Sequence, residues 1–371
     1  MHYRRLGKTG LNVSQLGFGA MRLPMIGEGE QQVVDREPAI AMIHRAFEGG
    51  VNYIDTAVGY CNRDSQRAVG EALRGWRDSI IVSTKNHYYD HNESQWRQHL
   101  EDSLRRLDID CIDIYNHHGV NWKRFTEDVQ PRLSNWMRRA KDEGLIRHIC
   151  TSFHDDNDAL KRIVDTGYVD VITLQYNLLN RSLEEGIAYA DEHDIGVVVM
   201  GPVAGGRLGA SSEVLESIVP NITRVPELAL RFVLNNPHVD IALSGMSTLQ
   251  QVEENLAIAS GEVSLCGAEM QLIDEHMRRL KKMEELYCTG CGYCLPCPQN
   301  VAIHRIFERY NIGKVYGQWE IAGKMYADLG AAPNDEREKA DACIACGTCE
   351  PKCPQNIPII EQLRAAHSAL S

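Results

Sequence analysis

The most specific spacing in this 371-residue chain belongs to eight cysteines near its C-terminal end. Within the first four, two residues separate neighbouring cysteines; the next three repeat that spacing, and the last follows after three residues. A proline directly follows each group. The eight are Cys288, Cys291, Cys294, Cys297, Cys343, Cys346, Cys349 and Cys353. Thiolates at this spacing can bind the iron atoms of a cubane, so the pattern predicts two 4Fe–4S clusters.

The proline after each group turns the chain away, which sends the fourth cysteine of one group to the other cluster. One cluster is then expected on Cys288, Cys291, Cys294 and Cys353, and the other on Cys343, Cys346, Cys349 and Cys297. The first group departs from the common pattern, because two residues rather than three precede its proline-linked cysteine. Zinc is the alternative metal, but zinc ribbons use two cysteine pairs rather than two quadruplets.

A second set of reactive side chains follows short apolar runs in the first third of the chain. Asp55 and Tyr60 come after the run at residue 51, Lys85 after the run at 80, and His118 after the run at 111. Taken singly, each has an ordinary structural explanation, such as a helix cap or a solvent-facing position. Four such residues at successive strand ends indicate a catalytic group, because chemistry in barrel enzymes gathers where the strands end.

The elements that would position these residues are eight β-like runs that alternate with helix-like segments. The first lies near Ser14 to Phe18, and the others begin at 51, 80, 111, 148, 169, 195 and 239. This rhythm predicts an α/β fold, a (β/α)8 TIM barrel over residues 1–280. A doubly wound sheet is weakened as an alternative, because no Gly-x-Gly-x-x-Gly follows a strand and opens a helix. Residues 281–371 are expected to form a small helical ferredoxin-like domain, since apolar residues between the cysteine groups recur at helical spacing.

The composition, with 43% hydrophobic and 24% charged residues, indicates a soluble globular protein. A net charge of −12 disfavours partners such as nucleic acid or an anionic membrane, which need a basic face. Because the sequence shows neither a signal peptide nor a run of about 18 apolar residues, we expect a cytoplasmic protein. In that reducing compartment clustered cysteines indicate metal rather than disulfides.

The sequence resembles the aldo-keto reductase superfamily, and its tail resembles the branch that carries a C-terminal ferredoxin-like module. The resemblance rests on RRLGKTGLNVSQLGFGAMRL, NYIDTAVGY, STKN, IDIYNHHG, LQYN and GMSTLQQVEENL. It implies a catalytic tetrad of Asp55, Tyr60, Lys85 and His118, with His117 as the adjacent, less well aligned candidate. Tyr60 would protonate the alkoxide that hydride transfer leaves, and Lys85, paired with Asp55, would favour phenolate character. His118 would orient the carbonyl oxygen or help to relay the proton.

The same resemblance implies NAD(H) or NADP(H) as the cofactor. Ser152 and Gln175 match the residues that hold the nicotinamide carboxamide, although Phe153 replaces the usual asparagine beside the serine. Met200 stands where an aromatic residue commonly stacks on the nicotinamide.

Two further departures concern the choice between the two cofactors. Gly245 and Gln251 stand where basic residues commonly grip the 2′-phosphate, so the charge-assisted bonds that select NADP are missing and NADH is at least as plausible. The positions expected at the cofactor, with the last two at its adenine, are Gly19, Met21, Ser152, Gln175, Met200, Gly201, Pro202, Gly245, Met246, Ser247, Gln251, Glu254 and Asn255.

The resemblance therefore implies an oxidoreductase that acts on a small-molecule carbonyl or alcohol. Its clusters could relay electrons to a redox protein partner, or could be structural or form a docking surface. Nicotinamide moves two electrons as hydride whereas a cluster moves one, so direct exchange would need a flavin, a substrate radical or a partner. A barrel that has lost turnover and serves as a nicotinamide-sensing scaffold is the third hypothesis, against which the intact tetrad argues.

Overall fold

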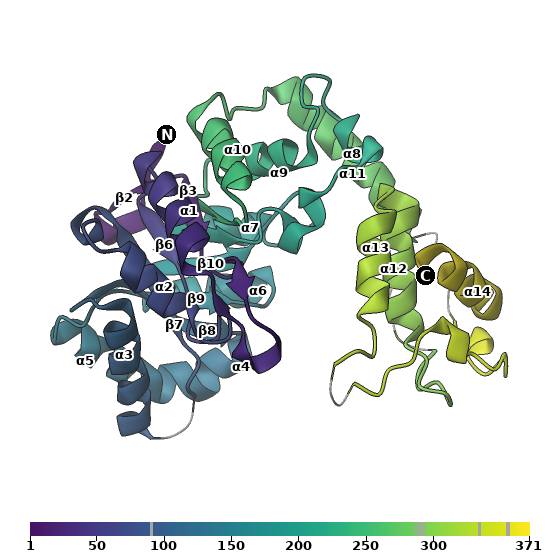
Figure 1. The fold of residues 1–371 in the computed structure, drawn as a ribbon, viewed down its shortest axis with the longest axis horizontal. Helices are drawn as coiled ribbons and strands as arrows, with labels where there is room; N and C mark the ends of the chain where they lie inside the picture. The colour runs from purple at the N-terminus through teal and green to yellow at the C-terminus, as the bar shows by residue number, and fades with distance from the viewer. Residues whose placement is uncertain (90–91, 286–287, 289–291, 293, 333–334, 354–356) are drawn as a thin grey trace. The chain divides into compact units, whose positions relative to one another are not determined.

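The computed structural model describes residues 1–89, 92–285, 288, 292, 294–332, 335–353 and 357–371 (Figure 1). These residues form two compact units. The first comprises Met1–Gly205 and Ala229–Leu265, and the second comprises Gly206–Leu228 and Cys266–Ser371. The sequence-based domain limits at residues 280 and 281 stay a prediction. Nowhere in the described ranges is a helix both long and apolar enough to span a membrane.

Within the described residues of the first unit, eight parallel strands close into a barrel in the order β10–β11–β12–β3–β6–β7–β8–β9. The predicted TIM barrel is therefore confirmed, with one strand at each of the eight apolar runs. The strands are β3 (Leu16–Gly19), β6 (Tyr53–Asp55), β7 (Ile81–Asn86), β8 (Ile112–Val120), β9 (Ile146–Phe153), β10 (Val171–Gln175), β11 (Gly196–Met200) and β12 (Ile241–Gly245).

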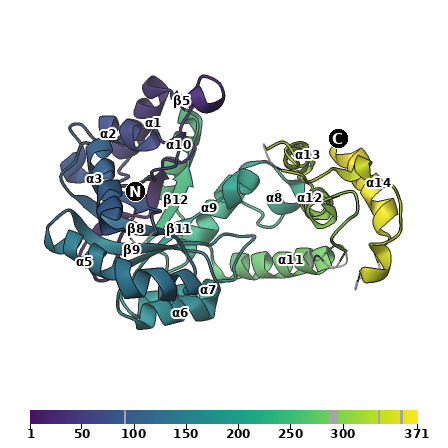
Figure 2. The same ribbon diagram turned by 90° about the horizontal axis from the view of Figure 1, so that it is seen from below.

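The helices that follow the strands surround the barrel, as Figure 2 shows for α1 to α3, α5 to α7 and α10. Their bounds are α1 (Arg36–Glu48), α2 (Ser65–Ala72), α3 (Glu93–Leu107), α4 (Trp122–Arg124), α5 (Ser134–Asp142), α6 (Asn157–Asp165), α7 (Glu184–Glu192), α9 (Val225–Asn235) and α10 (Leu249–Ser260). The short helix α8 (Glu213–Glu216) belongs to the second unit. A π-helical segment, Phe125–Leu133, joins α4 to α5.

A short hairpin that the sequence did not predict closes the barrel at the N-terminal ends of its strands. Its strands are β1 (Tyr3–Arg5) and β2 (Asn12–Ser14), which pair antiparallel. Leu6 and Val13 are fully buried and pack into the barrel interior. Gly196 leaves room for Leu6, because a Cβ atom there would lie 2.6 Å from the Leu6 side chain. A second hairpin, also unpredicted, joins β4 (Met25–Ile26) to β5 (Val33–Val34).

At this end of the barrel three aspartates each accept a backbone N–H from the preceding barrel strand, and Asn52 accepts one from β2 of the hairpin. Asn52 accepts from Ser14, Asp113 from Val82, Asp170 from Ile149 and Asp240 from Val197, at donor–acceptor distances of 2.7, 2.9, 3.0 and 2.9 Å. Each acceptor lies at the start of the following strand. These bonds satisfy backbone N–H groups at this end of the barrel.

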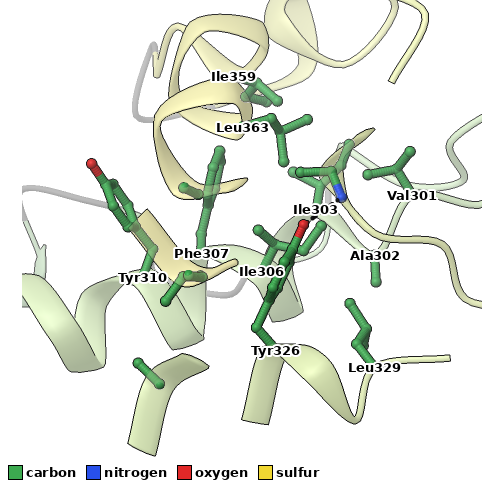
Figure 3. Packing of buried hydrophobic residues seen from close by; sticks show 14 of the residues in the cluster. Val301, Ala302, Ile303, Ile306, Phe307, Tyr310, Tyr326, Leu329, Ile359 and Leu363 are labelled. Carbon is green, nitrogen blue, oxygen red and sulfur yellow. Dashed lines mark hydrogen bonds between the residues drawn. The ribbon is translucent and has the colours of Figure 1, made fainter. Parts of the chain in front are cut away.

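The second unit is helical, which confirms the prediction of helices between the two cysteine groups. Its main helices are α11 (Gly267–Glu285), α12 (Ile303–Tyr316), α13 (Trp319–Ala327) and α14 (Ile359–Leu370). Gly317, with φ of +67°, ends α12 in the left-handed region and lets the chain reverse into α13. Figure 3 shows Ile306 and Phe307 of α12 packed with Tyr326, Ile359 and Leu363 in the core of this module.

The segment between β11 and α9 contributes to the second unit although its sequence lies between two barrel strands. The Gln318 side chain donates to the carbonyl of Arg207 at 2.8 Å and accepts from its Nε at 3.3 Å. The Arg207 guanidinium lies 4.6 Å from the centroid of the Tyr316 ring, and Ser212 donates to the Tyr316 carbonyl. Residues 206–228 are thereby fastened to the helical module.

Candidate active site and candidate cluster site

The barrel register places the four predicted catalytic residues at one edge. Asp55 is the last residue of β6 and lies beside Ser83 of β7, while Lys85 of β7 lies beside Asn116 of β8. Because parallel strands end at the same edge, side chains from three strands and one loop meet there.

Lys85 is the centre of a buried polar network. Its Nζ forms an ion pair with Asp55 and donates to the carbonyl of Thr56 at 3.0 Å. Ser83 donates to the second carboxylate oxygen of Asp55 at 2.8 Å, and Asn116 donates to Ser83 at 3.1 Å. Lys85 is 1% exposed and Asp55 4%, so this pair is held without competition from water.

Tyr60 lies in the loop after β6 and approaches Lys85 through its ring. Lys85 Nζ lies 5.1 Å from the centroid of that ring. The three residues after Tyr60 all have positive φ, from 50° to 69°, so the chain makes a tight turn directly behind it. His118 meets Tyr60 edge-on, with ring centroids 6.4 Å apart and an interplanar angle of 85°.

His117, the alternative to His118, points elsewhere. Its Nε2 lies 2.8 Å from the hydroxyl of Tyr168, and its side chain is 1% exposed. Consecutive residues of a strand face opposite sides of the sheet, so only one of the two histidines can face Tyr60. The structure places His118 there, where Tyr89 fixes the strand by donating to the His118 carbonyl at 2.7 Å.

The charges of this site are set mainly by burial. Burial raises the pKa of Tyr60, which the charge of Lys85 opposes and that of Asp55 reinforces; the net result is a tyrosine that stays protonated at neutral pH. The expected shift towards phenolate is therefore outweighed in the protein without cofactor. Burial, with smaller effects of Lys85 and of two neighbouring histidines, lowers the pKa of His118 to about 4. Its imidazole is neutral at pH 7 and can donate one N–H to a carbonyl oxygen.

Most of the predicted cofactor positions lie around the same edge. Gln175 of β10 is paired in register with Met200 of β11, and Gly245 of β12 with Gly19 of β3. A Cβ atom on Gly201 would lie 3.6 Å from the Gln175 amide, so the missing side chain leaves the space above Gln175 open.

The remaining cofactor positions differ in exposure. Pro202 and Met246 are buried, whereas Met21, Ser247 and Gln251 are exposed.

The two adenine candidates already have partners within the protein. Asn255 is 8% exposed and donates to Ser244 at 2.9 Å, and Glu254 accepts from Gln250 at 2.9 Å.

Ser152, at the end of β9, has a neighbour that the sequence did not single out. Its hydroxyl lies 3.3 Å from His154 Nε2, while Phe153 is 1% exposed. Where the usual asparagine is lost, His154 thus supplies a polar group beside the serine. The sequence signal for His154 was its position two residues after Ser152, because alternate residues of an extended chain point to the same side.

Arg22 is the functional candidate that sequence reasoning missed. It is exposed in the loop after β3, where its Nη2 donates to Gly205 at 2.9 Å and its carbonyl accepts from Ser247 at 2.8 Å. A Cβ atom on Gly245 would lie 3.5 Å from Arg22 Cδ. A basic side chain from another loop therefore lies directly beside Gly245.

The cysteines gather in the helical unit. Cys294 lies in its hydrophobic core, and Cys288, Cys297, Cys343, Cys349 and Cys353 pack against that core. One cavity is lined by Cys297 and Cys294 together with the second group, Cys343, Cys346 and Cys349. Both Cys294 and Cys297 therefore lie close to the second group, and the assignment of ligands to each cluster stays a prediction.

Thiolates that converge on one cavity suit iron–sulfur chemistry. Among the described residues, no three His, Cys, Asp or Glu side chains are close enough to share a single metal ion. Two cysteine quadruplets suit iron–sulfur clusters better than zinc, because zinc ribbons use two cysteine pairs. Cys291 lies outside the described residues.

Comparison with family models matches both units. The model of the aldo/keto reductase family covers residues 15–278, and that of the 4Fe-4S dicluster domain covers residues 287–357. An uncharacterized oxidoreductase of Bacillus subtilis is 27% identical over 314 residues, which cover 75% of this chain and 97% of that protein. The NADH-specific methylglyoxal reductase of Escherichia coli is 27% identical over 326 residues, covering 75% of this chain and 98% of the enzyme.

Among solved structures, the holo form of an aldo-keto reductase from Bacillus halodurans superimposes with a TM-score of 0.64 and 30% identity. That match covers 74% of this chain and 96% of the other. An aldo-keto reductase of Klebsiella pneumoniae in complex with NADPH shares the fold, with a TM-score of 0.60 and 23% identity over 74% of this chain and 95% of that one.

Proposed function

This chain belongs to the aldo/keto reductase family and carries a C-terminal 4Fe-4S dicluster domain, and we propose that it reduces a small carbonyl compound with NADH or NADPH. The observation that carries the proposal is Lys85, buried between the carboxylate of Asp55 and the ring of Tyr60 with His118 edge-on. A protonated tyrosine next to a fixed cation is suited to give a proton to an alkoxide.

The nicotinamide cofactor, when bound, supplies the hydride. Ser152 and Gln175 would hold its carboxamide, and the missing side chain at Gly201 would leave room for it. Tyr60 donates the proton from its Oη to the substrate oxygen. Lys85 stabilises the phenolate that remains, because its charge is fixed nearby in a site that excludes water. Neutral His118 donates an N–H to the same substrate oxygen and so orients it.

Arg22 supports the use of NADPH beside NADH. Its side chain passes beside Gly245 and ends in a guanidinium that donates to Gly205, so it carries a positive charge close to Gly245, where the sequence pattern lacks one. Guanidinium groups bind phosphate through short, charge-assisted hydrogen bonds. We therefore assign the 2′-phosphate of NADP(H) to Arg22.

The test is stopped-flow oxidation of NADH and NADPH by the anaerobically purified protein with a panel of small aldehydes and ketones. Tyr60→Phe should lower the single-turnover rate roughly 10²–10⁴-fold and leave cofactor binding, followed by fluorescence, nearly unchanged. Oxidation equally fast in Tyr60→Phe would remove the assignment of Tyr60. No oxidation with any compound would favour the nicotinamide-sensing scaffold.

For the helical unit we propose two 4Fe–4S clusters that relay electrons to a partner protein. Two one-electron centres together match one two-electron donor, but the exchange still requires a one-electron step at a flavin, a substrate radical or the partner. A structural role is the second candidate, favoured by the packing of the cysteines around the module's core. The variant Cys343→Ser separates these roles. Unchanged turnover with a less stable helical unit would support a structural role. Loss of the reduction of the remaining cluster by NAD(P)H would support electron relay.

A further inference from the structure

The cavity lined by Cys297 and the second cysteine group has a dry part and a wet part. Val301, Ile303 and Leu363 line it, and each of them is at most 1% exposed (Figure 3). Other lining residues, Cys346 and Thr348, are exposed. The loop that carries these two residues is therefore open to water.

Thr348 adds a hydrogen-bond donor to the wet part. Its Oγ1 lies 3.4 Å from the Sγ of Cys346. The loop reaches this arrangement through two left-handed residues, Ala345 with φ of +54° and Gly347 with φ of +74°, which turn Thr348 back towards Cys346. A metal-bound thiolate has no proton, so in the loaded protein the hydroxyl is the donor.

Cys294 of the first cysteine group also lines this cavity, on its dry side. Cys294 is 8% exposed and belongs to the hydrophobic core that α12, α13 and α14 form. Cys294 is thus surrounded by apolar side chains, whereas Cys346 of the second group is exposed.

Reduction adds one negative charge to a centre that four thiolates already make anionic. Water and hydrogen-bond donors stabilise that added charge, whereas apolar surroundings penalise it. Solvent exposure and donors to sulfur therefore both raise the reduction potential.

Resting on the cluster content proposed above, we infer that the two clusters are unequal and that Thr348 helps to make the second the stronger electron acceptor. The cluster with the higher potential is the one on Cys297, Cys343, Cys346 and Cys349. When the protein takes up a single electron, this cluster is reduced by one electron and the other stays oxidised. Thr348 is a positioning residue that acts through Cys346.

The experiment is an anaerobic titration of the full-length, cluster-loaded protein with dithionite, followed by electron paramagnetic resonance. It contains no nicotinamide, so it is independent of hydride transfer and of Tyr60. Iron and sulfide analysis, done first, separates the two proposals, since protein that loads fewer than two clusters contradicts the proposed cofactor content itself. We expect two reduction steps at distinct potentials.

Three variants assign the steps. Thr348→Val, which keeps the side-chain shape, should shift only the higher step to a lower potential, and Thr348→Ser, which keeps the hydroxyl, should leave it in place. Cys346→Ser should alter the signal of the higher step, and Cys294→Ser that of the lower. Simultaneous reduction of both clusters, an unshifted Thr348→Val, or equal shifts in Thr348→Val and Thr348→Ser would each overturn the inference.

Discussion

The Nζ atom of Lys85 lies 5.1 Å from the centroid of the Tyr60 ring. Its ion pair with Asp55 fixes it there, so the cation cannot move away when the tyrosine loses its proton. Burial raises the pKa of Tyr60 and Lys85 opposes that rise. In the proposed reaction Tyr60 would keep its proton in the resting protein and give it to the developing alkoxide, while Lys85 would stabilise the phenolate that remains.

Replacing Lys85 by methionine removes that opposing charge. We expect kcat to fall about 10²–10⁴-fold, while the dissociation constant of the cofactor changes only a few-fold. Steady-state rates and a fluorescence titration measure the two quantities. Lys123→Met, at an exposed lysine, is the control for loss of a lysine as such.

Because Lys85→Met leaves the Asp55 carboxylate buried without its cation, the variant could lose stability instead of catalysis. The double variant Asp55→Asn/Lys85→Met removes both charges. If its circular dichroism is native and its kcat lies within threefold of the wild type, Lys85 has no part in the reaction.

The pH dependence of the reaction should show no ionisation of His118 near neutrality. Burial first, then the charge of Lys85, lowers its pKa to about 4. The imidazole is thus neutral throughout the range from pH 5 to 8. The profile of kcat/KM should have no inflection near 6.5, and His118→Asn, another neutral donor, should retain more activity than His118→Ala. An inflection near 6.5 that His118→Asn abolishes would contradict the neutral role.

The barrel could be predicted from the sequence because its strands are buried on both faces. Continuous apolar runs such as those at β10 and β11 are typical of parallel strands that are covered on both faces. The strand register then brings Asp55, Lys85 and His118 to one edge. The β1–β2 hairpin escaped prediction because its strands are three residues long and carry mixed side chains.

The site residues contributed by loops were harder to predict. Arg22 follows β3 by three residues, and only the folded loop shows that it fills the space beside Gly245. Likewise, the attachment of residues 206–228 to the helical unit depends on Gln318, a buried amide more than a hundred residues away. Long-range pairing of this kind leaves no periodic pattern in the sequence.

Folding stability should decrease as the pH rises from about 4 to 7 because of Asp240. Burial, reinforced by Asp191 and opposed by Arg4 and the Val197 N–H, raises its pKa from 3.8 to about 7. Between these values the unfolded chain has lost the proton that the folded chain retains, so the unfolded state gains relative stability with rising pH. Asp240→Asn should keep the acceptor for Val197 and remove this dependence.

Thermal unfolding at pH 5, 6, 7 and 8 measures the effect. The difference in melting temperature between Asp240→Asn and the wild type should grow with pH and level off above pH 7. Glu192→Gln, at an exposed carboxylate, should follow the wild type. A constant difference at all four pH values would show that Asp240 is ionised in the folded protein as well.

The relative affinity for NADPH and NADH tests the proposed binding of the 2′-phosphate by Arg22. A charge-assisted hydrogen bond contributes roughly 1.5–3 kcal/mol, so Arg22→Gln should raise the dissociation constant of NADPH about ten- to a hundredfold and that of NADH much less. Titrations of protein fluorescence with each cofactor give both constants. Arg22→Lys keeps the charge but loses the planar pair of donors. Its dissociation constant for NADPH should therefore lie between those of the wild type and of Arg22→Gln. Equal losses for NADH and NADPH in Arg22→Gln would instead show that Arg22, through its bond to Gly205, orders the loop after β11 for either cofactor.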